Sequence, residues 1–100
     1  MKIGRTFTIS GHKINVKYSK SMFLGNEGCW AIYDDDTSTI WVRKGMPPSR
    51  KAEVLLHEVI HAISYIHGFD ISEKAVNTLA IEMIAFFRTN KLSFIRKILK

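Results

Sequence analysis

The stretch LLHEVIHAI, residues 55–63, places His57, Glu58 and His61 in a pattern that could bind a metal ion and use it chemically. On an α-helix, two residues four positions apart lie about 40° apart around the axis and about one turn apart along it. Two imidazoles in that arrangement can share one Zn²⁺ ion, with metal–nitrogen distances of about 2.0–2.1 Å. Glu58 is poorly aimed for a third ligand, but its carboxylate can reach a water held by the metal. This pattern, HExxH, typically uses its glutamate as a general base.

Such a site needs a third protein ligand, and the first candidate downstream is His67. Its spacing from His57 matches the extended pattern HExxHxxGxxH, but Ser64 stands where that pattern has glycine. In an unbroken helix, His67 would lie about 9 Å along the axis from His61, too far to share one ion. We therefore expect His67 to be a histidine at the helix end, near the C-terminal dipole.

Two glutamates are the other candidates for the third ligand. Glu73 follows a short turn that could fold it back toward the histidines, and Asn77, one turn later, could orient a ligating histidine through its amide. Glu82 would lie opposite His57 if the two helices formed a strictly antiparallel hairpin. A purely structural alternative is that Glu73 completes a capping box with Asp70. We predict Glu73 as the third ligand and leave the other two candidates open.

Hydrophobic patterning indicates the elements that precede this site. The segments RTFTIS (5–10) and KINVKYS (13–19) alternate with a period of two, and SGHK between them is typical of a hairpin turn. A second pair, CWAIYD (29–34) and TIWVR (39–43), is joined by the polar stretch DDDTS. We expect residues 1–44 to form three or four short, mostly antiparallel strands.

Helices are predicted in the second half of the chain, from residue 47 to residue 100. Residues 49–67 contain no glycine or proline, and Gly68 follows as a typical residue after a helix end. A second helix is expected over 71–89, with a buried stripe of Val76, Leu79, Ala80, Met83 and Phe87. A short amphipathic helix over 92–99 completes the pattern. Strands followed by helices predict an α+β fold in a single domain over residues 1–100.

Composition limits the function classes. The single cysteine, Cys29, excludes an intramolecular disulfide and a zinc site built from several cysteines. We see no signal peptide and no apolar window that would span a membrane, and we expect a cytoplasmic protein. The net charge of +6 would favour acidic partners. However, basic residues are concentrated only at the end, where SFIRKILK contains the single aromatic residue Phe94, so a nucleic-acid partner is only weakly indicated.

The segments LLHEVIHAI and GFDISEKAVNTLA resemble the zincin metallopeptidases that use a glutamate as third ligand (gluzincins). The closest resemblance is to small metallopeptidase-like proteins of phages and mobile elements, related to the ImmA/IrrE-type group, and it covers roughly residues 26–90. It implies zinc ligands at His57, His61 and Glu73 and a general base at Glu58. It also implies a small sheet packed on the HExxH helix, with TIWVR as the edge strand that lines a peptide-binding cleft.

These observations predict a zinc-dependent metallopeptidase, in which Glu58 activates a zinc-bound water for hydrolysis of peptide bonds in a peptide or protein substrate. A tyrosine could stabilise the oxyanion, but spacing selects neither Tyr33 nor Tyr65. The alternative is a non-catalytic, zinc-stabilised small basic domain that binds protein or nucleic acid. The presence of a well-placed Glu58, which a purely structural zinc site does not need, favours the enzyme.

Overall fold

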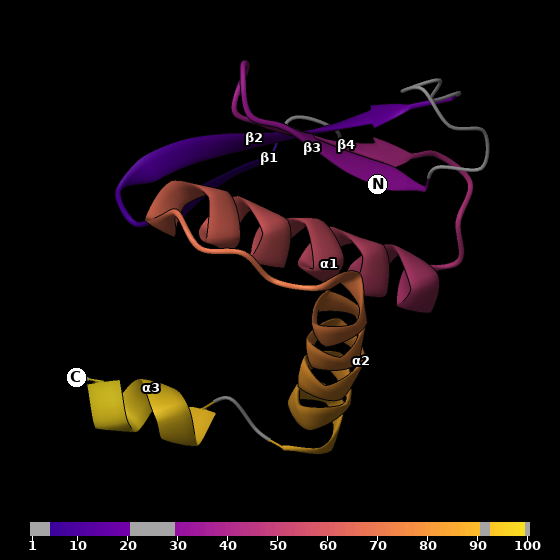
Figure 1. The fold of residues 1–100 in the computed structure, drawn as a ribbon. Coiled ribbons are helices and arrows are strands. Elements are labelled where there is room, and N and C mark those ends of the chain that lie inside the picture. Colours follow the sequence, from indigo (N-terminus) through magenta and orange to yellow (C-terminus); the bar gives the residue numbers. More distant parts are fainter. Residues whose placement is uncertain (1–4, 21–29, 91–92, 100) are drawn as a thin grey trace.

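The computed structural model describes residues 5–20, 30–90 and 93–99. Four strands precede three helices: β1 (Arg5–Ile9), β2 (His12–Ser19), β3 (Ala31–Asp34), β4 (Thr39–Arg43), α1 (Pro48–His67), α2 (Glu73–Thr89) and α3 (Ser93–Leu99). The α+β prediction is confirmed, with all three helices on one side of the sheet (Figure 1). Cys29 and the side chain of Phe94 lie outside the described part of the chain.

The sheet is mixed, with the strand order β1-β2-β4-β3. The β1–β2 and β3–β4 pairs are antiparallel and the β2–β4 pair is parallel, so the expectation of a mostly antiparallel sheet is confirmed. The prediction that TIWVR forms the edge strand is wrong. β4 contains Ile40 and Val42, both with 0% exposure. Their burial is best satisfied in the middle of the sheet, and the half-buried strand β3 takes the edge instead.

The predicted hairpin turn between β1 and β2 is confirmed. Ile9 pairs with His12, so the loop consists of Ser10 and Gly11 alone. Both loop residues have positive φ angles, 48° and 80°, as a two-residue hairpin turn of type I′ requires. This turn fixes the register that sends Ile14 and Val16 into the core.

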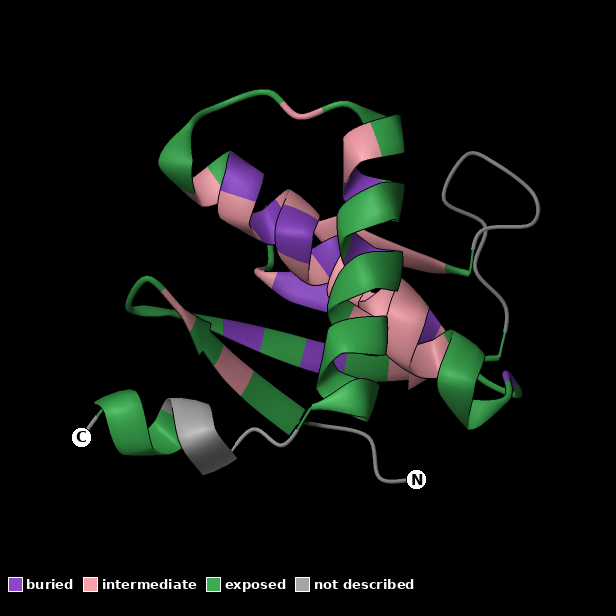
Figure 2. Cartoon of the chain, turned by 90° about the horizontal axis from the view of Figure 1, so that it is seen from below, coloured by how far each residue is buried: buried purple, intermediate pink, exposed green. Residues whose placement is uncertain are grey.

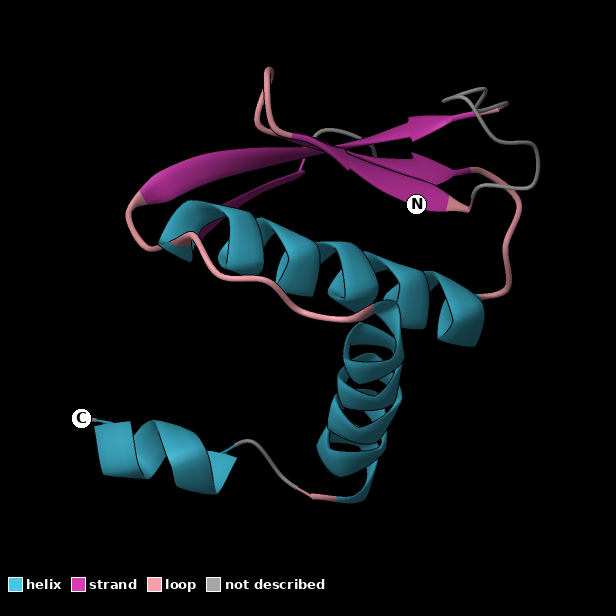
Figure 3. Ribbon diagram, viewed as in Figure 1, coloured by secondary structure: helices cyan, strands magenta, loops and turns pink. Residues whose placement is uncertain are grey.

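The main core lies between the sheet and α1. It contains Ile14, Val16, Ile40, Val42 and Met46, and α1 packs Val54, Leu55, Val59 and Ile66 against it. The helices all lie below the sheet in Figure 3, and in the described part of the chain no helix covers the opposite face. The long helix α1 is therefore held firmly by the sheet, which fixes the direction of its other faces.

The second helix is held by a much smaller cluster, in which Ile60 of α1 meets Val76 and Ala80. The predicted buried stripe is therefore correct for Val76 and Ala80 and wrong for its other members: Leu79, Met83 and Phe87 are 36–43% exposed. The physical reason is the direction of α2, which leaves α1 steeply so that only its first part packs (Figure 1), and its outer surface is mostly exposed (Figure 2).

The helix boundaries agree closely with those predicted for α1 and α2 and for the terminal helix. Among the described residues, no helix combines the length and the apolar character that crossing a bilayer would demand.

Candidate metal centre

Helix α1 carries the two histidines and continues without a break past them. It begins at Pro48, which suits the first helical turn, and it ends at Gly68, whose backbone is left-handed with φ 72°. The N–H groups of Gly68 and Phe69 both donate to the carbonyl of Ser64, at 2.9 and 3.1 Å. The hydroxyl of Ser64 also donates to the carbonyl of Phe69. Ser64 thus closes the helix end from within the helix and supports the sharp reversal that follows.

The reversal ends at Ser72, which caps α2. The Ser72 hydroxyl accepts a hydrogen bond from the backbone N–H of Ala75 at 3.1 Å. The alternative in which Asp70 caps this helix is therefore not formed, because Ser72, directly before the helix, is the cap instead. As a result, Glu73 is the first residue of α2 and is not engaged in a capping box.

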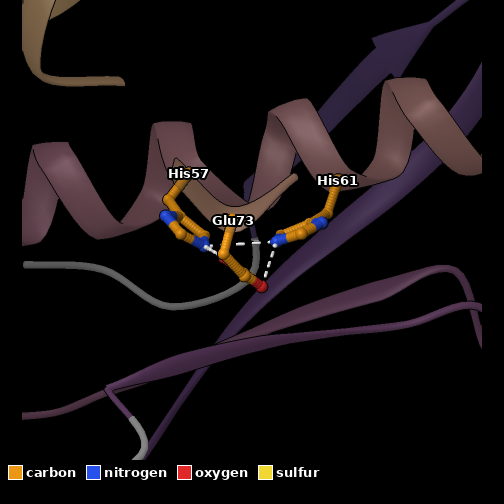
Figure 4. A group of neighbouring side chains, drawn as sticks. All are labelled: His57, His61 and Glu73. Carbon is orange, nitrogen blue, oxygen red and sulfur yellow. Dashed lines mark hydrogen bonds and ion pairs between the residues drawn. The ribbon is translucent and has the colours of Figure 1, made fainter. Parts of the chain in front are cut away.

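The side chain of Glu73 lies between the two histidines (Figure 4). Its carboxylate oxygens lie 3.1 Å from His57 Nε2 and 3.2 Å from His61 Nε2. The two Nε2 atoms lie 3.2 Å from each other. These three side chains form a group that could hold a metal ion, with two ligands from α1 and one from α2.

The dimensions of this group fit a tetrahedral zinc ion. Ligand atoms about 2.0–2.1 Å from a tetrahedral zinc ion lie about 3.3–3.4 Å apart, close to the three observed separations. Two imidazole nitrogens and a carboxylate oxygen are donors that zinc accepts readily. The side chains of His57, His61 and Glu73 are 20%, 29% and 69% exposed. A metal ion held by these three side chains would have its fourth position open to solvent or to another molecule.

The alternative third ligands lie elsewhere. His67 is exposed at the end of α1, and its Nε2 lies 2.7 Å from the Ser10 hydroxyl in the β1–β2 turn. Glu82 is an exposed residue further along α2 and is not part of the group. α2 does not run antiparallel along α1, so the hairpin geometry that would bring Glu82 to His57 is not formed (Figure 1).

Glu58 lies beside this group but faces the sheet. It is buried, with 8% exposure, and its Oε2 atom lies 3.9 Å from His57 Nε2. The pKa of the Glu58 carboxyl is raised to about 7, mainly by burial and also by the negative charge of Glu73, while a hydrogen bond from the Tyr33 backbone opposes the rise. A carboxyl with a pKa near neutrality can both accept and release a proton at physiological pH.

Asn77, predicted to orient a ligating histidine, lies one turn beyond Glu73 on α2. It is exposed and lines a cavity of about 430 Å³ together with His57 and Glu58. Within the described residues, no hydrogen bond joins its amide to either histidine. The orienting role of Asn77 therefore stays a prediction.

An open cavity of about 840 Å³ joins the group to the edge of the sheet. Its walls include the three potential ligands, Glu58 and Ala31–Tyr33 of β3. Tyr33 and Tyr65 both line it, with ring centroids 6.1 Å apart in an edge-to-face contact. The hydroxyl of Tyr65 donates a hydrogen bond to Asp35, and this bond raises the pKa of Tyr65. The pKa of Tyr33 is also raised, first by its partial burial and then by the negative charge of Asp35. Both phenols are thus protonated donors at neutral pH.

The contribution of β3 was missed in the sequence, because the order of strands in the sheet was not apparent there. Its backbone reaches Glu58 through Tyr33, and the turn after it places Asp35 beside Tyr65. A second acidic group, Asp34 to Asp36, lies in that turn, where Asp34 accepts hydrogen bonds from the Asp36 N–H and the Thr37 hydroxyl. These bonds identify it as an Asx-type turn.

Comparison of the chain with protein families, with curated proteins and with solved structures gives no match in any of the three. The site consists of a His57–His61–Glu73 group compatible with an HExxH helix, next to a buried carboxyl and an open cavity.

Proposed function

We propose that this protein is a zinc-dependent peptidase, with His57, His61 and Glu73 holding the metal and Glu58 acting as the general base. The main support is the combination of two features at one place: a three-ligand group with an open fourth position, and a buried carboxyl with a pKa of about 7 beside it. A structural zinc site would use four closed ligands and would need no such carboxyl.

The metal would supply Lewis acidity, polarising a peptide carbonyl and lowering the pKa of a water molecule toward neutrality. Glu58 would accept the proton of the attacking water and deliver it to the departing amine nitrogen. Its burial favours the protonated form, which makes the first transfer, from the water to the carboxylate, easier. Tyr33 and Tyr65, protonated phenols on the cavity wall, are candidates to stabilise the oxyanion, and Tyr65 would have to give up its hydrogen bond to Asp35 to do so.

The substrate would be an extended peptide. β3 is an edge strand of the described sheet and lies along the cavity, so its backbone can pair with a peptide added as a further strand. Main-chain pairing of this kind would align a scissile bond with the group without requiring a particular side chain. The edge strand is thus β3, in place of the segment TIWVR.

The test is cleavage of a labelled unfolded protein such as casein by the zinc-loaded wild type, by Glu58→Gln and by Glu82→Gln. We expect Glu58→Gln to retain zinc and to lose activity by a factor of about 10²–10⁴, while Glu82→Gln behaves as the wild type. Equal cleavage by wild type and Glu58→Gln would exclude this role of Glu58.

A second function is favoured by one specific observation, the small contact between α1 and α2. Only Ile60, Val76 and Ala80 form its buried centre, so a metal bound by residues of both helices would stabilise their arrangement. This is the non-catalytic, zinc-stabilised domain. Tight zinc binding without cleavage of any substrate by wild type would favour it over the peptidase.

A further inference from the structure

Trp41 lies on the face of the sheet that no described helix covers, and Trp30 lies at the edge of that face, where Arg50 of α1 also reaches its ring. Trp41 pairs with Lys17 on one neighbouring strand and with Ile32 on the other, so these three side chains share that face. The N–H of Arg43 donates to the carbonyl of Trp30 at 2.8 Å, which places Trp30 beside Arg43 at the edge of the sheet, and Trp30 also lines the cavity of about 430 Å³ with His57 and Glu58. Neither tryptophan belongs to either core cluster.

Cations accompany both rings. Lys17 Nζ lies 5.7 Å from the ring of Trp41, and the guanidinium group of Arg43 lies 5.1 Å from the ring of Trp30. The guanidinium group of Arg50, at the start of α1, lies 5.7 Å from the centre of the Trp30 ring. Tryptophan is costly to leave in water, and Trp30 is 41% exposed. Large aromatic surface interleaved with positive charge is the composition of a surface that recognises a partner.

The charge of this face is uneven. Lys17 and Arg43 project from β2 and β4 beside Trp41, whereas Asp34 and the acidic turn after it lie at the opposite end of the β3–β4 pair from Trp30, where Lys13 also lies. A polyanion would therefore lie over Trp41, Lys17 and Arg43, away from the acidic turn. The partner expected from charge complementarity is anionic and offers flat rings for stacking.

We propose that this face of the sheet binds single-stranded nucleic acid. Trp41 stacks on a base, Trp30 provides a second stacking platform, and Lys17 and Arg43 contact the phosphates. Unpaired bases expose the flat faces that an aromatic sheet surface requires, whereas a duplex hides them. Trp41, Lys17 and Arg43 lie on the opposite face of the sheet from the metal group, so the inference tested at Trp41 and Lys17 does not depend on the proposed peptidase activity.

The experiment measures fluorescence anisotropy of a labelled oligothymidine of about 12 nucleotides, a length within the range of single-stranded binding sites. We expect saturable binding that weakens as salt is raised, and quenching of tryptophan fluorescence on binding. Trp41→Ala is expected to weaken binding at least about fivefold, as loss of one stacked base would, and Trp41→Phe to keep most of the affinity. Oligouridine of the same length compares RNA with DNA, and binding of either supports the proposal.

Lys17→Glu is the decisive variant, because Lys17 is exposed and its replacement leaves the core intact even if Trp41→Ala fails to fold. The matched control is Arg96→Ala combined with Lys97→Ala, two exposed cations of α3. We expect Lys17→Glu to weaken binding at least about tenfold and the control to change it little. Weakening in the α3 variant alone would assign binding to the C-terminal helix and overturn the proposal. So would the absence of saturable binding, or equal competition by polyglutamate, which has no bases to stack.

Discussion

The carboxylate of Glu73 lies 3.1 Å from the imidazole Nε2 of His57, although the two residues belong to different helices. The contact is created by the reversal between α1 and α2, which starts at Gly68 and ends at the Ser72 cap. Since the α1–α2 contact is otherwise small, this group and this reversal depend on each other.

Zinc stoichiometry tests the ligand set. Purified with zinc present, the wild type is expected to contain one zinc ion per chain by elemental analysis. Glu73→Ala removes the only ligand from α2 and is expected to reduce zinc to well below one ion. His67→Ala and Glu82→Ala are matched controls of the same residue types, and both should retain it. Loss of zinc in His67→Ala alone would contradict the position of His67 beside Ser10.

Metal removal tests whether zinc links the two helices. A ligand at 100 times its dissociation constant stabilises the folded state by about 2.7 kcal/mol. For a chain of this size, each kcal/mol corresponds to a change of about 4–8 °C in the melting temperature. We expect a chelator to lower the wild-type Tm by at least about 10 °C in thermal denaturation followed by circular dichroism. Glu73→Ala should start at a lower Tm and respond little to the chelator; an equal response in both proteins would show that the group does not bind the stabilising metal.

Much of this fold could be predicted from local patterns. The alternation around Ile14 and Val16 and the Ser10–Gly11 turn contain enough information to define the first hairpin. The HExxH spacing and Gly68 similarly define α1 and its end. In each case, the deciding interactions join residues close in sequence.

The incorrect predictions concern long-range arrangement. Nothing local to TIWVR shows that β4 pairs in parallel with β2 and leaves β3 at the edge. The periodicity of α2 likewise indicated a full apolar stripe, but the steep direction of the helix leaves Phe87 exposed. For the site, the histidine pair could be predicted from spacing alone, whereas the place of Glu73 depends on the angle between two helices. The backbone contact of Tyr33 with Glu58 depends on the sheet order and has no local signal.

The stability of the metal-free protein should depend on Glu58. The pKa of its carboxyl is raised from 4.5 to about 7, mainly by burial. Below about pH 4.5 the carboxyl is protonated in both states. As pH rises from there to about 7, the unfolded chain releases the proton while the folded chain keeps it, so the unfolding free energy falls. The loss is on the order of 3 kcal/mol at most and levels off above pH 7.

Urea denaturation of the metal-free wild type across this pH range, beside Glu58→Gln, measures the effect. The glutamine has nearly the same shape and does not ionise, so the contribution of Glu58 to the pH slope should disappear. Other groups titrate equally in both proteins, and the difference between the two curves isolates Glu58. Parallel curves would contradict the raised pKa of this carboxyl.

The left-handed backbone at Gly68 should matter for zinc affinity as well as for folding. Its φ angle is 72°, and a Cβ atom added there would meet nothing within 4 Å, so the cost of Gly68→Ala comes from the backbone alone. We expect the unfolding free energy to fall by about 1 kcal/mol. Because alanine favours relaxation of the reversal that positions Glu73, zinc affinity should fall by up to about tenfold.

Gly11→Ala is the matched control, since Gly11 also has a positive φ, 80°, and open space around it, but lies in the β1–β2 turn. It should cost similar stability in urea denaturation and leave zinc affinity, measured by competition with a chromogenic chelator, unchanged. Equal zinc affinities in the two variants would show that the reversal at Gly68 does not control the position of Glu73.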